Sequence, residues 1–177
     1  MTTRRRSVQM LAVPLLMGAL ALIGLGCTPP PAPPGTDCPV GTFSATGDAP
    51  CTPAPPGTFV NTVGATSATQ CALGTFQPSA AQVSCLLSPL GFFVAATGST
   101  SATAAPAGTF VDTVGAASAT PCAVGTFQGL VASISCTFAP VGSYVDVVGA
   151  VAAIECPPGT TTLATGSTSE SDCVVLP

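Results

Sequence analysis

A glycine-anchored motif returns along this chain at a fixed spacing, and that spacing constrains the fold more than any other feature. The first anchor is Gly41, and the second, Gly57, follows sixteen residues later. Every later interval is seventeen residues. We number the units 1 to 8 by their anchors, which are Gly41, Gly57, Gly74, Gly91, Gly108, Gly125, Gly142 and Gly159. Such self-similarity indicates a repeat array, because a unit this short cannot bury a core alone and must stack on its neighbours.

The position two residues after each anchor forms an aromatic column. It holds the only tyrosine and six of the eight phenylalanines, while unit 8 has Thr161 there. The column is Phe43, Phe59, Phe76, Phe93, Phe110, Phe127 and Tyr144. A ring repeated at one position packs more often than it binds, so we expect this column to be the core along which units stack.

A longer period overlies the short one. Residues 57–65 recur at 108–116 with one difference, Asn61 against Asp112, and these two stretches lie three units apart. The array therefore grew partly by duplication of three-unit blocks.

Each unit has the pattern of a β-hairpin. The anchor segment is rich in Thr, Phe and Val, which favour strands. A second glycine, at which a positive φ costs little, follows seven residues after five of the anchors. No helical periodicity follows residue 27. We therefore predict an all-β, elongated array of hairpin repeats with disulfide staples. The alternative is a β-solenoid with one unit per coil and the aromatic column as an internal stack.

Eight of the nine cysteines follow the repeat. Four lie three residues before an anchor, and each of these has a partner later in the same unit. The simplest pairing is Cys38–Cys51, Cys71–Cys85, Cys122–Cys136 and Cys156–Cys173, in units 1, 3, 6 and 8. Eight cysteines allow 105 pairings, so this one rests on repeat logic. Each such loop stabilises by about 3 kcal/mol in the chain-entropy treatment.

The runs Cys-Pro-Val-Gly-Thr-Phe-Ser at Cys38 and Cys-Pro-Pro-Gly-Thr at Cys156 resemble a known repeat family. They are similar to the cysteine-rich repeats of ephrin receptors and of the tumour-necrosis-factor-receptor type, and especially to bacterial surface proteins built from degenerate copies. The resemblance covers residues 38–173 and implies an extended array exposed outside the cell. It implies no particular ligand. The chain departs from the family where a cysteine is replaced by Ala54, Ser88, Ala105 or Ala139.

The N-terminus predicts export. Arg4, Arg5 and Arg6 precede an apolar stretch that ends just before Cys27, which resembles a bacterial lipoprotein signal. Lipidation of Cys27 would also leave an even number of cysteines to pair. The alternative is a plain secretory signal with Cys27 free or bonded between molecules. We expect an export signal at 1–26, a lipid-anchored cysteine with a proline-rich linker at 27–37, and the repeat array at 38–177.

Composition excludes whole classes of function. Charged residues make up 6% of the chain, histidine is absent, and all three basic residues precede residue 7. Nucleic-acid binding needs Lys or Arg, and Ser-His or Cys-His catalysis needs an imidazole. No Cys-x-x-Cys pair suits zinc, and the column Asn61, Asp112 and Asp146 fits turn formation better than calcium binding. We therefore expect no enzyme activity, no metal, no cofactor and no nucleic-acid partner.

The remaining functions are structural or recognition roles. Our first hypothesis is a cell-envelope-anchored spacer, adhesin or assembly component, held on the outer membrane or cell surface by lipid. Its partners would be the membrane, through the lipid anchor, and further copies or an extracellular protein. The alternative is a receptor-like extracellular module that binds one protein ligand. Candidate contact residues are those that break the column rules: Leu86, Leu87, Phe92 and Phe138.

Overall fold

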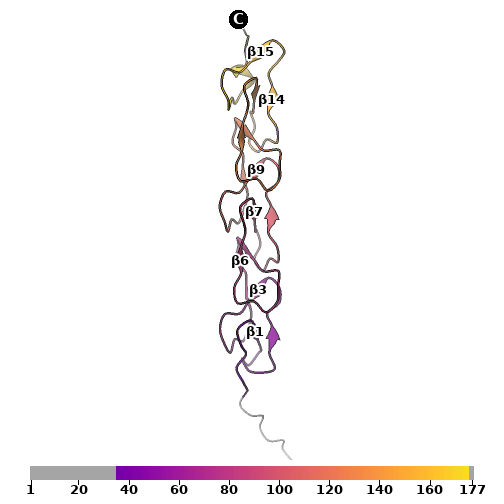
Figure 1. The fold of residues 1–177 in the computed structure, drawn as a ribbon, viewed down its shortest axis with the longest axis vertical. Helices are drawn as coiled ribbons and strands as arrows, with labels where there is room; N and C mark the ends of the chain where they lie inside the picture. Colours follow the sequence, from indigo (N-terminus) through magenta and orange to yellow (C-terminus); the bar gives the residue numbers. More distant parts are fainter. Residues whose placement is uncertain (1–34, 176–177) are drawn as a thin grey trace, which may run out of the picture. The chain divides into compact units, whose positions relative to one another are not determined.

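Eight two-stranded antiparallel hairpins, one per unit, make up a computed structural model of the chain that describes residues 35–175. The hairpins follow one another in sequence order along the array, from β1 to β15 (Figure 1). They pair β1 (Thr42–Phe43) with β2 (Thr52–Pro53), β3 (Thr58–Phe59) with β4 (Thr69–Gln70), β5 (Thr75–Phe76) with β6 (Leu86–Leu87), β7 (Phe92–Phe93) with β8 (Thr103–Ala104), β9 (Thr109–Phe110) with β10 (Thr120–Pro121), β11 (Thr126–Phe127) with β12 (Thr137–Phe138), β13 (Ser143–Tyr144) with β14 (Ile154–Glu155), and β15 (Thr160–Thr161) with β16 (Val174–Val175).

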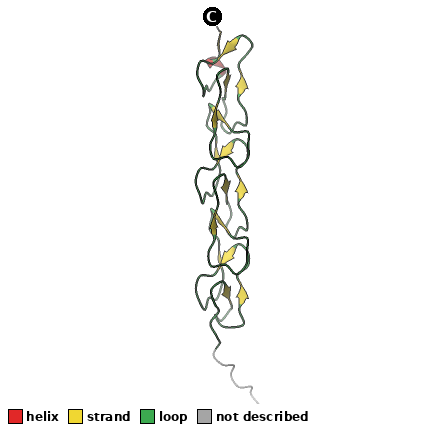
Figure 2. Cartoon of the chain, viewed as in Figure 1, coloured by secondary structure: helices red, strands yellow, loops and turns green. Residues whose placement is uncertain are grey.

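The prediction of an all-β hairpin array is confirmed. Loops and turns connect the short strands (Figure 2), and the helical content of the described part is one 3-10 turn, η1 (Glu170–Asp172). Each sheet stays within one unit, so residues 35–175 do not form the closed solenoid that was the alternative. Within the same residues, no helix has the length and hydropathy that a membrane span requires. The predicted export signal, Cys27 and residues 28–34 of the linker lie outside the described residues.

A tight turn opens every unit and explains the Gly-Thr pair of the motif. In unit 1 the backbone N–H of Thr42 donates to the Pro39 carbonyl at 3.1 Å, and the Thr42 hydroxyl donates to the same oxygen at 2.7 Å. Gly41 is the third residue of this turn and has a φ of 82°. Type II turns need a positive φ at this position, which favours glycine. Unit 4, with Phe92 in place of Thr, keeps only the backbone bond, at 3.1 Å to Pro89.

Hydrogen bonds to the backbone join each unit to the next. Between units 4 and 5, the N–H of Gly91 donates to the Val111 carbonyl at 2.9 Å and that of Val94 donates to Ala116 at 3.0 Å. In the opposite direction, the N–H of Gly115 donates to the Ser88 carbonyl at 2.8 Å. Equivalent bonds recur at every other junction between units 1 and 8, except that the last junction uses the Thr162 hydroxyl as its first acceptor. Stacking is therefore carried by the main chain.

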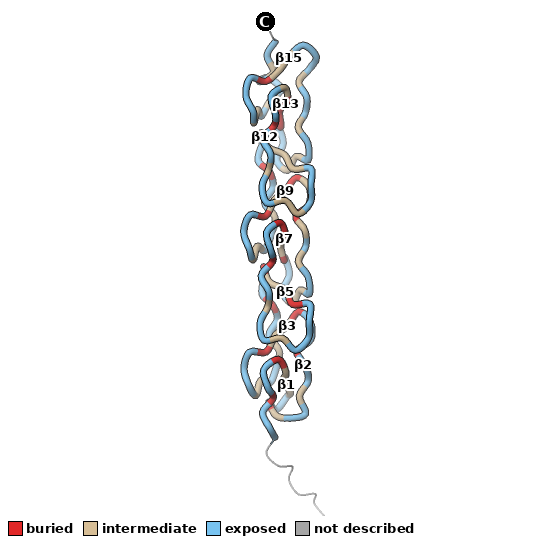
Figure 3. The backbone as a smooth tube through the Cα atoms, viewed as in Figure 1, coloured by how far each residue is buried: buried red, intermediate tan, exposed pale blue. Residues whose placement is uncertain are grey.

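The buried residues flank the aromatic column rather than forming it. The position three before the anchor is fully buried in units 1 to 7, and the position three after it is buried in six of the eight units (Figure 3). The side chains at these two positions include Cys38, Ala54, Cys71, Ser88, Ala105, Cys122 and Ala139 before the anchor, and Val60, Gln77, Val94, Val111, Val145 and Thr162 after it. Main chains that approach this closely leave room only for small or medium side chains between units.

Our prediction that the aromatic column is the core was wrong for most of its members. The six phenylalanines of the column are half-buried, and only Tyr144 is buried. Each strand is two residues long and pairs with one partner strand, so a hairpin alone covers little of its ring, and six of the seven rings stay partly exposed.

Candidate binding surface

Four disulfides lie in units 1, 3, 6 and 8. They join Cys38 to Cys51, Cys71 to Cys85, Cys122 to Cys136, and Cys156 to Cys173, with α-carbons 5.6 to 5.8 Å apart. These are the pairs that the simplest pairing gives. In each unit the second cysteine directly precedes the second strand, so the disulfide fixes that strand against the start of its own unit.

The other four units carry small residues at both of these positions. The pairs are Ala54 with Ala68, Ser88 with Ala102, Ala105 with Ala119, and Ala139 with Ala153. The first member of each pair was recognised from the sequence, and the second was not. Its signal was present, since each of these alanines directly precedes the second strand of its unit, as the second cysteine does elsewhere.

The acidic residues do not converge on a metal site. Within residues 35–175, no group of three His, Cys, Asp or Glu side chains is placed to hold an ion. Asn61, Asp112 and Asp146 are exposed, and each directly precedes the bend and turn of its unit. Asp172 has a structural role: its carboxylate accepts from the N–H groups of Thr168 and Ser169 at 3.0 and 3.1 Å and caps η1.

The four candidate contact residues differ in their surroundings. Leu86, Leu87 and Phe138 are exposed, whereas Phe92 is half-buried in β7 and is a poorer contact residue than the sequence indicated. Leu87 and Phe138 also have a neighbour inside the array. They lie beside the second glycine of the unit two further on, Leu87 beside Gly115 and Phe138 beside Gly166.

Exposed apolar side chains concentrate in the turns of units 6 to 8. Leu130 is 72% exposed, Val131 66% and Leu163 77%, and Val147 and Val148 of unit 7 are exposed as well. The corresponding turns of units 3 and 4 hold only small or polar residues, such as Ser79, Ala80, Ala95 and Ala96. The same turns of units 2 and 5 each expose one valine, Val63 and Val114. Exposed apolar side chains are candidates for a protein contact where several lie together.

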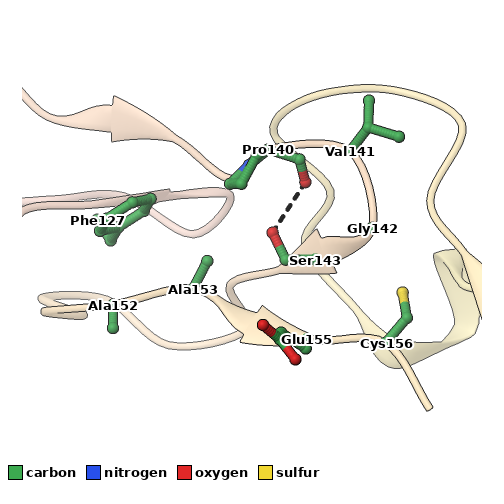
Figure 4. A pocket seen from close by; sticks show the side chains of 9 residues that line it. All are labelled: Phe127, Pro140, Val141, Gly142, Ser143, Ala152, Ala153, Glu155 and Cys156. Carbon is green, nitrogen blue, oxygen red and sulfur yellow. Dashed lines mark hydrogen bonds between the residues drawn. The ribbon is translucent and has the colours of Figure 1, made fainter. Parts of the chain in front are cut away.

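A pocket of about 470 Å³ lies in the same part of the array, at unit 7 (Figure 4). Its wall combines the opening turn of unit 7 with the end of that unit's hairpin. The lining residues are Phe127, Pro140, Val141, Gly142, Ser143, Ala152, Ala153, Glu155 and Cys156. The Ser143 hydroxyl donates to the Pro140 carbonyl at 2.8 Å, which leaves Glu155 as the one charged side chain facing an otherwise apolar and main-chain surface.

Tyr144 is the buried member of the aromatic column and belongs to the same unit. Burial raises the pKa of its phenol above the ordinary value, and the carboxylates of Glu170 and Asp146 raise that pKa further. The phenol therefore stays neutral at physiological pH.

Two regions of the chain match a known family. The family described as tyrosine-protein kinase ephrin type A/B receptor-like matches residues 64–104 and 132–173. The first region spans the end of unit 2 through unit 4, and the second spans the end of unit 6 through unit 8. No curated protein matches the chain. The resemblance inferred from the cysteine spacing is confirmed at the level of the repeat, and these cysteine-rich, disulfide-bonded repeats are typical of extracellular or cell-surface proteins.

Proposed function

We propose that this chain, whose repeats are ephrin-receptor-like, is a non-enzymatic spacer or adhesin anchored to the cell envelope by lipid at Cys27. The observation that carries the proposal is the repeated set of hydrogen bonds at every junction between units. Because units bond to their neighbours through the main chain, a unit can be added or lost without requiring particular side chains at the new junction. Such an array suits the task of holding a contact surface at a set distance from a membrane.

The sequence supports the tether and the absence of catalysis. The basic and apolar N-terminus ends at Cys27, and the proline-rich run after it favours an extended linker. With histidine absent and no basic side chain after Arg6, the chain lacks the usual acid–base partners of a catalytic site.

The spacer role is tested by shortening the array. Deleting residues 57–107 removes three units and joins Pro56 to Gly108, whose sequence repeats that of the removed segment. On cells that display the chain with a C-terminal epitope tag, the tag should lie closer to the membrane in the shortened variant, as measured by super-resolution imaging. An unchanged distance would contradict a spacer. Release of the Cys27→Ser variant into the medium, with the wild type retained, tests the tether separately.

A second candidate, a receptor-like module that binds one extracellular protein, is favoured by the apolar turns of units 6 to 8. The variant Leu130→Ser with Val131→Ser should lose binding to a cell-surface extract. The matched control is Val63→Ser, which changes a valine with 62% exposure in the turn of unit 2. Equal loss in both variants would indicate general adhesiveness of the array rather than a localised receptor surface.

A further inference from the structure

The pocket at unit 7 corresponds to a site that is filled everywhere earlier in the array. In units 1 to 6, the anchor glycine packs against the carbonyl oxygen of a turn residue that belongs to the unit two further on. In unit 5, for example, Gly108 lies against the Gly149 carbonyl so closely that a methyl group on Gly108 would overlap that oxygen. These anchors are platforms that accept a turn.

Two further groups hold the accepted turn. The N–H of Gly149 donates to the carbonyl of Cys122 at 2.8 Å, and the side chain of Pro121 lies beside Gly149. A seated turn is therefore contacted by the anchor of one unit, by the last residue of that unit's second strand, and by the carbonyl directly after that strand. The same arrangement seats Gly166 on Gly125, with the Ala139 carbonyl as acceptor and Phe138 alongside.

In unit 7 the three equivalent groups are Gly142, Glu155 and the Cys156 carbonyl, and all three residues line the pocket (Figure 4). Within residues 35–175 no turn is seated there. The nearest atom to a methyl group on Gly142 would be the Thr161 hydroxyl oxygen, 3.6 Å away, and no described backbone N–H donates to the Cys156 carbonyl. The pocket is thus a turn-accepting site with its platform, acceptor and flanking side chain in place.

We propose that this pocket binds a glycine turn of another polypeptide. The glycine would adopt a positive φ, donate its N–H to the Cys156 carbonyl and rest its own carbonyl on Gly142. The interface inside the array supplies the argument, because the same contacts bind turns at six earlier positions. This inference goes beyond the proposed spacer role and does not depend on the lipid tether.

The flanking side chain indicates the charge of the partner. At the equivalent position units 1 to 6 have Pro53, Gln70, Leu87, Ala104, Pro121 and Phe138, whereas unit 7 has the carboxylate of Glu155. Residues 7–177 hold no Lys or Arg, so no turn in this sequence has a cation beside its glycine. The proposed occupant is a turn of a different protein with Lys or Arg next to its glycine, which would place a cation beside the Glu155 carboxylate.

The test uses backbone-cyclised hairpin peptides that present a Val-Lys-Gly-Ala or a Val-Glu-Gly-Ala turn. Added to the isotope-labelled protein, the lysine peptide should shift the amide resonances of Gly142, Ser143 and Cys156. It should bind about two- to fivefold more tightly than the glutamate peptide, as expected for one partly exposed ion pair. Glu155→Gln should remove that difference, and Glu155→Lys should reverse it.

A matched pair of glycine variants tests the platform. Gly142 and Gly159 both have a φ of 87° and both have space for a methyl group, so alanine strains the two positions equally. Gly142→Ala should abolish peptide binding because its methyl would meet the seated carbonyl, while Gly159→Ala should leave binding unchanged. Equal binding by both variants, or shifts confined to residues away from the pocket, would overturn the proposal. The charge reversal at Glu155 remains decisive should Gly142→Ala fail to fold.

Discussion

At the scale of single residues, the positive-φ positions divide into two kinds. The anchor glycines of units 1 to 6 have no space for a side chain because a turn carbonyl from two units on occupies it. The second glycines that lie seven residues after an anchor have more room. Ala81 and Ala132 stand at the second-glycine position of units 3 and 6 with φ of 59° and 56°, which shows that a methyl group fits there.

This division predicts different outcomes for the same substitution. Gly98→Ala keeps its nearest neighbour at 3.5 Å, so it should cost only the left-handed backbone strain of about 1 to 2 kcal/mol. Gly74→Ala carries the same strain and also overlaps the Gly115 carbonyl, so its loss of unfolding free energy should be at least about twice as large. Urea denaturation of the two variants measures the difference. Equal losses would mean that the anchor contact adjusts freely.

Tyr144 provides a direct probe because it is the only tyrosine. Its pKa is raised in the folded state, so the folded chain holds the phenolic proton more tightly than the unfolded chain does. The resulting stabilisation is present below the unfolded pKa of about 10 and is lost as pH rises through the higher folded value. Ultraviolet titration should give a midpoint above that of the urea-unfolded protein. Tyr144→Phe should reduce the loss of stability at alkaline pH, and an unshifted midpoint would contradict the assignment.

At the scale of the hairpin, disulfide and alanine pairs occupy equivalent positions. In β5 and β6 Thr75 pairs with Leu87, and in β9 and β10 Thr109 pairs with Pro121, which is the same register. Unit 5 has no disulfide but has the same strand register and the same junction hydrogen bonds as unit 3. The disulfide therefore stabilises a geometry that main-chain hydrogen bonds already specify.

The equivalence predicts that a fifth disulfide can be introduced. Ala105→Cys with Ala119→Cys, in a Cys27→Ser background, should form a bond across the same fourteen-residue separation as Cys71 and Cys85. Because that loop is closed in the unfolded chain as well, unfolding free energy should rise by about 3 kcal/mol. Peptide mapping detects the bond, and denaturation with and without reductant measures its effect. Two persistent free thiols would show that unit 5 has a different spacing.

At the scale of the whole array, each unit bonds to the next and touches the one after. Stability therefore depends on unbroken continuity along residues 35–175. Side chains at the surface contribute less to this continuity than the glycines and the small buried residues do. The surface is thus free to vary between units, as Ser79 and Ala80 in the turn of unit 3 and Leu130 and Val131 in that of unit 6 illustrate.

Removal of residues 57–107 tests how far this continuity extends. The shortened chain keeps the motif in phase, so it should fold, with a denaturant m-value lower by about a third because m scales with the surface exposed on unfolding. A circular dichroism melt and a urea titration on the same sample check both points. An m-value equal to that of the full chain would mean that the removed units do not unfold together with the rest.

The sequence by itself determined the unit, its length, its hairpin character and the pairing partners that repeat logic favours for the eight cysteines. It could do so because turn glycines and strand-forming residues act within a few positions of one another, and a period makes each signal visible many times. The ephrin-receptor-like character also followed from local spacing around cysteines such as Cys38 and Cys156.

Only the tertiary structure decided which columns are buried and where a turn-accepting pocket stays open. The sequence placed the core in the rings, but the units approach through main-chain bonds, so small residues such as Ala105 and Ser88 fill the interior and the rings stay half-buried. Gly108 contacts the carbonyl of Gly149, which lies two units further on. The spacing within a single unit does not predict this contact. Packing between units that are distant in sequence depends on how the hairpins rotate as they stack, which local propensities do not specify.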